Sequence, residues 1–515
     1  MRRAIILFTR VPIPGQTKTR LMPFLRGEDC AALHSEFIRN ASYACRGVDA
    51  ELLVYYTEGH DHTPKDGVNL LKKLIKDAKG FYPQKGDGLG ERMSQAFAES
   101  FAMGYERALL VGTDIPQISA DIFRKAFQQL DRCDVVINPT EDGGYYLIGL
   151  KEALDDIWEV PHYGTNTVFQ DTLCQLEKAG LNVCEGQRLR DIDTKEDLLA
   201  WYGADRCIHC KACTKNCRFL EKYGLDLAGF SERPELAYSC FLCGRCKAVC
   251  PKDIDGERIA LLMRRLRLDR ASYKGLLWEK SPYKFANYRK GKGKTVLFPG
   301  CNFTAFYPKT TGYLERLMTK HGIGTIYDCC GKPVYELGLR GASDEQLDRI
   351  TARFKEQGVE ELVVICPNCY HFFKDRLEIP VVTIYQKLKE LCVGQAVKKD
   401  SLPIYYPCPD REKKEMFQTL SPYLEGEVTG PFQGVQCCGL GGCAGVKEPE
   451  LSKEMAESAK NYSEELYTYC ASCISNFRRK GMASAYHVLP LILGIEEKVP
   501  LGIQPFMNRV RRKFL

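Results

Sequence analysis

The sequence predicts a multidomain α/β protein whose second part is organised around cysteine residues. Three observations lead to this prediction. In the first 203 residues, apolar runs typical of buried strands alternate with amphipathic helical patterns. From residue 207 onward the chain carries twenty of its 25 cysteines. Beyond residue 294, one arrangement of cysteines occurs twice with an offset of about 105 residues.

The first region reads as strands and helices in alternation. Such an alternation predicts a mostly parallel sheet with helices on both faces, and ligands then bind at the carboxyl ends of the strands. The expected strands are Ala4 to Thr9, Glu51 to Thr57, Arg107 to Gly112 and Asp134 to Asn138, and the expected helices are Asp29 to Cys45, Glu91 to Tyr105 and Asp121 to Leu130.

The length of 515 residues allows roughly three or four domains of about 150 residues each. Composition and pattern changes divide the chain into five expected regions. These are an α/β domain (1–203), a small α-helical domain with two cysteine runs (204–265), a basic helix and linker (266–293), and two repeated α/β cysteine-rich units (294–395 and 396–515).

No stretch suggests insertion into a membrane. The longest apolar runs fall well short of the roughly 18 residues that a membrane span needs. The run Ala4 to Phe8 follows two arginines as in a signal peptide, but it is too short and continues directly into Thr9 and Arg10. We therefore expect a cytoplasmic protein without a transmembrane segment, which could still dock peripherally on a membrane partner.

The two cysteine runs have the spacing of a ferredoxin that holds two [4Fe-4S] clusters. In such runs, three cysteines two residues apart wrap one cluster and the fourth reaches the other cluster. Zinc sites or metal-free thiols fit eight matched cysteines less well. The expected ligand sets are Cys207, Cys210, Cys213 and Cys250 for the first cluster (ferredoxin site A), and Cys217, Cys240, Cys243 and Cys246 for the second (ferredoxin site B).

The repeat downstream brings five cysteines together in each of its copies. A Cys-Cys-Gly sequence places two thiolates side by side, and its glycine permits a tight turn. A distant cysteine and a Cys-x-x-Cys complete each set, and strands lead into them at Thr295 to Phe298, Leu362 to Ile365 and Pro403 to Tyr406. Site 1 comprises Cys301, Cys329, Cys330, Cys366 and Cys369, and site 2 comprises Cys408, Cys437, Cys438, Cys470 and Cys473.

With these motifs, residues 204 to about 495 resemble the heterodisulfide reductase family and its relatives in anaerobic glycerol-3-phosphate dehydrogenase, glycolate oxidase and lactate-utilisation complexes. The resemblance implies a noncubane [4Fe-4S] cluster that reduces disulfides, or a relay between a flavoprotein and another carrier. Both copies keep all five cysteines, so one or two further clusters are expected, the alternative being that one copy is only structural. No Gly-x-Gly-x-x-Gly follows a strand, which points to a separate flavoprotein or other redox partner.

The remaining cysteines and the basic residues receive simpler interpretations. Cys392 is expected in the core, and Cys443 as a buried small residue or a redox-active thiol. The formal net charge of +7 does not indicate nucleic acid, because each cluster with its four thiolates carries roughly two negative charges. The basic stretches Arg264 to Arg270 and Lys284 to Lys294 are expected as a solvated helix face and linker, or as a docking surface for an acidic partner.

The first region carries candidate ligands where its strands end. Gly15, Lys18 and Arg20 follow the first strand, in a loop suited to phosphate groups. Asp114 follows a buried strand, where a carboxylate can hold a divalent metal on a nucleotide diphosphate. The sequence Glu141-Asp142-Gly143-Gly144-Tyr145 follows the next strand, and Asp191 and Asp193 close the region, although Asp193 could equally belong to a helix cap.

This region resembles GT-A-type transferases named for arsenosugar biosynthesis. The resemblance rests on these motifs, on Phe8-Thr9-Arg10 and on the segment Gln84 to Met93, which contains Asp87 and Arg92. The resemblance spans residues 1 to about 202. It implies a nucleotide-diphospho-sugar transferase that uses Mg²⁺ or Mn²⁺, a fold shared with nucleotidyltransferases. Tyr163-Gly164-Thr165-Asn166 replaces the tryptophan-serine-threonine segment of that family, so the acceptor and the donor stay open.

Two hypotheses follow. In the first, the chain is bifunctional: Asp114 holds the metal, Asp142 or Glu141 acts as base toward an acceptor hydroxyl, and the cysteine-rich part is an electron-transfer or oxidoreductase module. The residues expected to bind substrate or nucleotide are Gly15, Lys18, Arg20, Asp87, Arg92, Gly143, Gly144, Tyr145 and Asp193. In the second, the chain is purely a redox subunit of a flavoprotein complex, with a nucleotidyltransferase-like or regulatory binding module at its start. In a variant of either hypothesis, the two repeats reduce disulfide substrates themselves instead of only relaying electrons.

Overall fold

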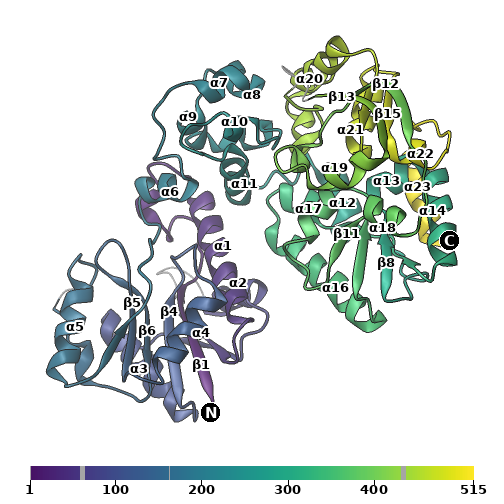
Figure 1. The fold of residues 1–515 in the computed structure, drawn as a ribbon. Coiled ribbons are helices and arrows are strands. Elements are labelled where there is room, and N and C mark those ends of the chain that lie inside the picture. The colour runs from purple at the N-terminus through teal and green to yellow at the C-terminus, as the bar shows by residue number, and fades with distance from the viewer. Residues whose placement is uncertain (1, 58–63, 162, 431–435, 515) are drawn as a thin grey trace. The chain divides into compact units, whose positions relative to one another are not determined.

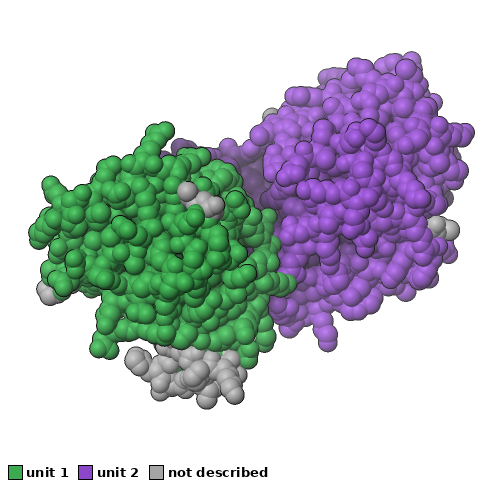
Figure 2. Space-filling model, turned by 90° about the horizontal axis from the view of Figure 1, so that it is seen from below, with its two compact units in different colours: residues 1–205 green, residues 206–515 purple. Residues whose placement is uncertain are grey.

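The computed structural model describes residues 2–57, 64–161, 163–430 and 436–514. The chain forms two compact units, residues 1–205 and 206–515, which Figure 2 shows in green and purple. Each unit has its own core and its own sheets, so each is described by itself.

Unit 1 is built on one seven-stranded sheet, visible in Figure 1. Its strand order is β3-β2-β1-β4-β6-β5-β7, and β6 alone of these strands runs antiparallel to its neighbours. The mostly parallel sheet expected from the sequence is therefore confirmed. The strands are β1 (Arg3–Arg10), β2 (Glu51–Thr57), β3 (Gly80–Pro83), β4 (Arg107–Gly112), β5 (Val135–Pro139), β6 (Tyr145–Leu150) and β7 (Val183–Glu185).

Helices cover both faces of this sheet, because successive side chains of a strand point to opposite faces. Ile5 and Leu7 belong to one apolar cluster, beneath α1, α2 and α4, whereas Ala4 and Ile6 belong to the other, beneath α3 and α5. The helices are α1 (Gly27–Cys45), α2 (Pro64–Leu74), α3 (Leu89–Ala102), α4 (Ala120–Gln129), α5 (Val168–Lys178) and α6 (Lys195–Tyr202).

Three strands of unit 1 have no clear signal in the sequence. The edge strands β3 and β7 are short and only partly buried, so they lack an apolar run. Strand β6 is almost fully buried, but its first residues overlap the Gly-Gly-Tyr motif that the sequence favours as a ligand loop.

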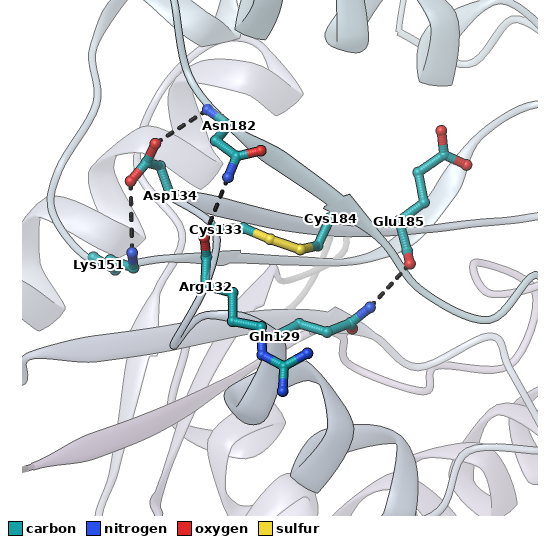
Figure 3. The surroundings of a disulfide bond; sticks show 8 residues. All are labelled: Gln129, Arg132, Cys133, Asp134, Lys151, Asn182, Cys184 and Glu185. Atoms are coloured by element: carbon teal, nitrogen blue, oxygen red, sulfur yellow. Dashed lines mark hydrogen bonds and ion pairs between the residues drawn. A yellow bond between two sulfur atoms is a disulfide. The ribbon is translucent and has the colours of Figure 1, made fainter.

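A disulfide joins Cys133, just before β5, to Cys184 in β7 (Figure 3). The same corner is held by the side chain of Asn182, which donates to the carbonyl of Arg132, and by Gln129, which donates to the carbonyl of Glu185. The disulfide thus ties the edge strand to the sheet. The two cysteines are 51 residues apart and show no sequence pattern, because only the parallel pairing of β5 and β7 brings them together.

Unit 2 begins with a ferredoxin-type region that contains helices and no strand between residues 206 and 265, all of which are described. The basic stretch that follows holds one short helix, α12 (Lys274–Lys280). The earlier helices are α7 (Ala212–Asn216), α8 (Arg218–Tyr223), α9 (Leu227–Ser231), α10 (Arg245–Ala248) and α11 (Gly256–Leu266).

The two repeats that follow share one topology. In the first, all strands are parallel in the order β11-β10-β8-β9. In the second, the parallel pairs β12-β13 and β14-β15 are connected by a bridge between Ile404 and Tyr467, which gives the matching order. The strands are β8 (Thr295–Phe298), β9 (Gly324–Thr325), β10 (Glu361–Val364), β11 (Val381–Thr383), β12 (Val397–Pro403), β13 (Leu424–Thr429), β14 (Leu466–Thr468) and β15 (Ala485–His487).

Helices surround these two small sheets, and the predicted α/β fold of the repeats is confirmed. Those of the first repeat are α13 (Cys301–Phe306), α14 (Pro308–Lys320), α15 (Lys332–Glu336), α16 (Arg340–Gln357), α17 (Pro367–Phe373) and α18 (Ile384–Glu390). Those of the second are α19 (Glu415–Leu420), α20 (Pro449–Tyr462), α21 (Ala471–Arg479), α22 (Val488–Ile492) and α23 (Gln504–Phe514).

Two expectations about single residues are wrong. Arg264, expected on a solvated helix face, is fully buried because its guanidinium reaches four backbone carbonyls. Cys392, expected in the core, is exposed in a turn with a φ of 54°. Among the described residues, no helix is long and apolar enough to cross a membrane.

Candidate metal centres and transferase site

The cysteines of ferredoxin site A line one small hollow near the surface. Cys207, Cys210, Cys213 and Cys250 converge there from the two cysteine runs. The loop winds tightly, with positive φ angles at His209 and Lys211, and both of these side chains bind the buried carboxylate of Asp226. Cys210 is exposed, so this site is the more accessible of the two ferredoxin sites.

Ferredoxin site B lies deeper. Cys240 and Cys246 are buried, and both interact electrostatically with Cys217 and Cys243. Three of the four thiols thus come from the second cysteine run and one from the first, which is the crossed arrangement that the spacing predicts. The backbone of Gly256 lies against Cys246, where a Cβ would come within 2.6 Å of the sulfur atom.

Site 1 collects its cysteines where the strands of the first repeat end. Cys301 follows β8, and its thiol lies 3.9 Å from that of Cys329. Cys330 contacts Cys369, which also contacts Cys366. Gly331, with a φ of 92°, makes the turn that the Cys-Cys-Gly sequence predicts, and all five cysteines are buried.

Site 2 repeats the arrangement. Cys437 contacts both Cys408 and Cys438, and Cys473 contacts Cys438 and Cys470. Gly439 adopts a φ of 81° so close to the carbonyl of Ser452 that a side chain there would clash. Both sets of five therefore bring soft thiol ligands together, and nine of the ten cysteines are buried, an environment that suits an iron–sulfur cluster.

A cation accompanies each five-cysteine site, buried at site 1 and half-buried at site 2. The ammonium of Lys280 is buried near Cys301 and Cys329, and although burial opposes its charge, the two sulfur atoms raise its pKa. In site 2, the guanidinium of Arg411 donates to the Cys408 sulfur at 3.6 Å and to the hydroxyl of Tyr405. These cations would offset negative charge on a bound cluster. No periodic pattern in the sequence singles out Lys280 or Arg411 for this position.

The two five-cysteine sites adjoin one another. Asn302, which follows Cys301, donates to the hydroxyl of Ser472 at 2.7 Å. Asn368, inside the first Cys-x-x-Cys, donates to the sulfur of Cys470 at 3.8 Å. Each Cys-x-x-Cys thus touches the opposite repeat, so the sites form one continuous centre.

Gln436 joins ferredoxin site B to site 2. Its side-chain amide donates to the sulfurs of Cys217 at 3.7 Å and Cys243 at 3.5 Å. The amide oxygen accepts from the backbone N–H of Arg218, which fixes the orientation of the group. Cys243 also contacts Cys437 directly. One ligand of each centre is therefore in side-chain contact with the other centre.

In unit 1, three charged groups meet beneath the carboxyl ends of the strands. The ammonium of Lys18 lies 2.9 Å from Asp114 and 2.7 Å from Asp193, and its side chain is only 4% exposed. Desolvation opposes ionisation of Asp114, but Lys18 and His34 outweigh it and hold the pKa of this carboxyl well below its usual value. Lys18 therefore orients two carboxylates instead of standing free for a phosphate.

Asp191 completes an acidic cluster in this place. Desolvation, and the negative charges of Asp142 and Asp193 next to it, raise its pKa to about 7. The backbone N–H of Ile192 donates to the carbonyl of Asp114, which brings the Asp191–Asp193 loop against the end of β4. Three converging carboxylates opposed by one buried lysine leave a net negative charge at this place, and carboxylate oxygens are the donors that Mg²⁺ or Mn²⁺ prefers, so the residues fit a divalent cation.

The other predicted residues of unit 1 surround this cluster less closely. Glu141 pairs with Arg190 at 2.6 Å, and Arg20 lies 3.7 Å from Asp193 with its side chain mostly exposed. Asp142 accepts from the hydroxyl of Thr140 and from the N–H of Gly144.

The glycine-rich loops have the conformations that only glycine adopts easily. Gly15 and Gly143 have φ angles of 81° and 94°. The Tyr145 hydroxyl lies near the sulfur of Met93. Arg92 at the start of α3 is half-buried and donates to the carbonyls of Gly86 and Asp87, so this part of the motif is closed into a turn by its own hydrogen bonds.

Asp193 also precedes a helix cap, as the sequence suggests. Thr194 and Asp197 form a capping box at the start of α6. The functional neighbour that the sequence does not single out is His34, which lies 3.4 Å from Asp114. Its ring also forms hydrogen bonds with the carbonyl of Arg10 and the hydroxyl of Thr9, which fix its position beside the carboxylate.

Comparison with protein families matches three stretches of the chain. Residues 44–165 match the family described as "Uncharacterized protein conserved in bacteria (DUF2064)". Residues 206–255 match the 4Fe-4S dicluster domain. Residues 295–374 and 405–478 match the CCG cysteine-rich domain.

Unit 1 is similar to a solved structure described as a proposed nucleotide-diphospho-sugar transferase of Desulfovibrio desulfuricans G20. The two are 31% identical over 41% of this chain and 91% of that chain, with a TM-score of 0.37. Unit 1 thus combines the DUF2064 match with transferase-like structural neighbours. A cytidylyltransferase of Leptospira borgpetersenii also matches, with 16% identity over 40% of this chain and 87% of that chain and a TM-score of 0.28.

Unit 2 is similar to curated iron–sulfur proteins of methanogens. One of the subunits of the fumarate reductase (CoM/CoB) of Methanothermobacter marburgensis is 23% identical over 331 residues, 52% of this chain and 66% of that protein. An uncharacterized iron–sulfur protein of Methanococcus maripaludis is 22% identical over 329 residues, 53% of this chain and 67% of that protein. The chain thus spans about two thirds of these relatives, and it combines a transferase-like domain with a CCG-type iron–sulfur module.

The raised pKa of Asp191 generates a prediction about stability. Because the folded pKa of about 7 exceeds the unfolded value of about 3.9, the carboxylate destabilises unit 1 above pH 7 and has no such effect below pH 4. Asp191→Asn should therefore stabilise unit 1 near pH 8 by about 2 kcal/mol, half of what the pKa difference gives, since solvent screens the charges.

Urea unfolding followed by the fluorescence of Trp158 and Trp201 measures this effect. The exposed Asp121→Asn serves as the matched control and should behave like the parent chain at both pH values. A gain in stability for Asp191→Asn that is equal near pH 4 and pH 8 would contradict the raised pKa.

Gln436 generates the second prediction. Replacement by the similarly shaped Met removes two N–H donors to cluster sulfurs, and such donors favour the reduced state of a cluster. Gln436→Met should therefore lower the reduction potential of the cluster in ferredoxin site B and leave that of site A unchanged. Redox titration monitored by electron paramagnetic resonance measures both, with the exposed Gln418→Met as control. Unchanged potentials in both sites would show that the contact has no electronic role.

Proposed function

We propose that the chain is a bifunctional enzyme. Its first unit transfers a group from a nucleotide-sugar with the help of Mg²⁺ or Mn²⁺. Its second unit takes electrons from a flavoprotein or another redox partner and delivers them to the paired five-cysteine sites. The single observation that carries the redox half is the contact of Gln436 and Cys437 with the thiols of ferredoxin site B, because it makes a continuous path of ligand sets.

The exposure of the cysteines supports one direction of electron flow along this path. Cys210 of ferredoxin site A is exposed, whereas Cys217 and Cys437, at the junction of site B and site 2, are buried and Cys243 is half-buried. Electrons would thus arrive at site A, pass site B and reach site 2 before site 1. Iron–sulfur clusters, when bound, supply one-electron steps, and the chain's own part is to hold them close together and exclude water.

The acidic cluster supports the transferase half. In this proposal Asp114, Asp191 and Asp193 hold the divalent cation, and a bound cation neutralises the leaving nucleotide diphosphate. Lys18 keeps Asp114 and Asp193 in place, and the exposed Arg20 reaches the phosphates. Glu141 or Asp142 would take the proton of an acceptor hydroxyl, and Gly143 allows that acceptor to approach the backbone.

The second candidate function is a redox subunit in which unit 1 only binds a ligand. It is favoured by one observation: Lys18 is already saturated by two carboxylates and the Ile192 carbonyl, so one of the predicted phosphate ligands is engaged within the protein. A binding measurement and an activity measurement together separate the two functions.

Nucleotide binding is the third prediction. Nucleoside triphosphates and nucleotide-sugars, titrated calorimetrically into the full chain with Mg²⁺ or Mn²⁺, should bind only when the metal is present. Asp114→Asn and Asp191→Asn should each weaken binding at least tenfold, because each removes a charged metal ligand. The matched control is again Asp121→Asn, which lies on the outer side of α4. If no nucleotide or nucleotide-sugar binds, the transferase proposal fails while the redox proposal stands.

Iron content is the fourth prediction. Four loaded centres hold about sixteen irons per chain, and the ferredoxin sites alone hold about eight. Protein purified without oxygen should approach the higher value. Cys330→Ser and Cys438→Ser should each remove about four irons, whereas Cys443→Ser, outside both ligand sets, should remove none. A parent value of about eight would show that the five-cysteine sites do not carry clusters.

A further inference from the structure

The outer surface of α23 combines features that a surface exposed only to water rarely shows. Four of the fourteen large apolar side chains that are exposed among the described residues lie between positions 501 and 514. Ile503 is 74% exposed and Phe514 is 68% exposed, and Leu501 and Met507 accompany them. This group of side chains, with the cations described below, is called the α23 surface.

The outer side chains of α23 belong to a regular helix, so fraying of the chain end is not what exposes them. Met507, Arg511 and Phe514 recur every three or four residues, so they form one stripe of the helix. Both flanks of this stripe are packed: Phe506 meets the ring of Phe285 edge to face at 5.4 Å, and Asn508 donates to the carbonyl of Ala305. The helix is therefore fixed on its inner side while its outer apolar side remains uncovered.

The segment from residue 498 to 514 carries charge of one sign. Residues 498 to 514 include five basic residues and no acidic residue. Two of them, Arg509 and Arg512, pair with Glu279 and Glu315 of the underlying protein. The other three, Lys498, Arg511 and Lys513, have no acidic partner in the described part of the chain.

A basic hollow of about 330 Å³ opens beside the stripe. Lys498, Arg511 and Arg512 line it together with polar and proline side chains, namely Gln504, Asn508, Pro308 and Pro500. Arg511 belongs to both the hollow and the stripe, so a group held in the hollow would lie directly beside the apolar side chains. Lys498 and Arg511, the two of these cations without an acidic partner, suit a phosphate group, which accepts several charge-assisted hydrogen bonds.

We propose that the α23 surface binds an anionic phospholipid bilayer. The side chains of Leu501, Ile503, Met507 and Phe514 enter the interface between head groups and acyl chains, and the hollow receives a lipid phosphate. An exposed apolar stripe bordered by lysine and arginine is the pattern of helices that lie in the plane of a membrane surface. A protein partner would need an acidic and apolar groove of matching shape, whereas an anionic bilayer supplies both properties without any such match.

This placement has a consequence for the redox path, which rests on the proposed function. On the inner side of α23, Phe506 and Val510 pack against the apolar cluster that contains Cys301 and Cys329. One helix, about 10 Å across, therefore separates site 1 from the membrane. Site 1 would be the centre of the chain that lies nearest a lipid-soluble electron carrier.

The test is sedimentation of the full chain, purified without oxygen, with phospholipid vesicles. We expect binding to vesicles that contain phosphatidylglycerol, little binding to pure phosphatidylcholine, and weakening by salt. Each lost basic residue costs about fivefold in partitioning, so Arg511→Glu with Lys513→Glu should reduce binding at least tenfold. Ile503→Ser with Phe514→Ser should do the same by removing apolar area.

The control is Lys460→Glu with Val446→Ser, which removes an exposed cation and an exposed apolar side chain elsewhere in unit 2 and should bind like the parent. A Met507→Trp variant adds a readout that does not depend on loss of binding, since its emission should shift to the blue on vesicles. Iron content verifies that each variant is folded. No binding to anionic vesicles, equal binding to neutral ones, or undiminished binding by both double variants would overturn the proposal, whatever the outcome for nucleotides and electrons.

Discussion

The guanidinium of Arg264 holds together the parts of unit 2 that must stay in contact. It is fully buried and donates to the carbonyls of Ala237 and Cys240 in the ferredoxin region, of Glu336 in the first repeat and of Gly442 in the second. The ring of Tyr238 covers it at 4.7 Å. A buried charge without partners would strongly destabilise the folded state. These four hydrogen bonds supply the partners that the buried guanidinium needs.

The same interaction fixes the geometry around the proposed electron path. Cys240 is one of the cysteines predicted for ferredoxin site B, and Gly442 lies in the loop that follows the Cys-Cys-Gly of site 2. Two glycines in that loop pack so closely on Phe241 and Leu242 that side chains would clash with the ferredoxin region. The contact of Cys243 with Cys437 is thus a result of backbone packing around one arginine, and Gln436 only completes it.

Residue spacing and local sequence patterns predict much of this architecture. The features that they do not predict depend on contacts between residues far apart in the sequence. The crossed ligand sets of the ferredoxin region depend on spacing, so the grouping of Cys217 with Cys240 and Cys246 can be anticipated. The burial of Arg264 cannot, because basic residues in a helix are usually solvated and no neighbour in sequence indicates the carbonyls that bind it. The tie between Cys133 and Cys184 depends on the order of strands in a sheet, which no local pattern specifies.

The two repeats share a topology, yet their surroundings give them different roles. Site 2 faces the ferredoxin region through Gln436, whereas the corresponding position of the first repeat holds Asp328, whose carboxylate accepts from the hydroxyl of Tyr288. Site 1 is covered instead by α23 through Phe506 and Val510. The two copies of the domain thus differ in what surrounds them, one facing the ferredoxin region and the other covered by α23. The asymmetry resides in the residues next to the cysteines, because both sites have the same set of five cysteines.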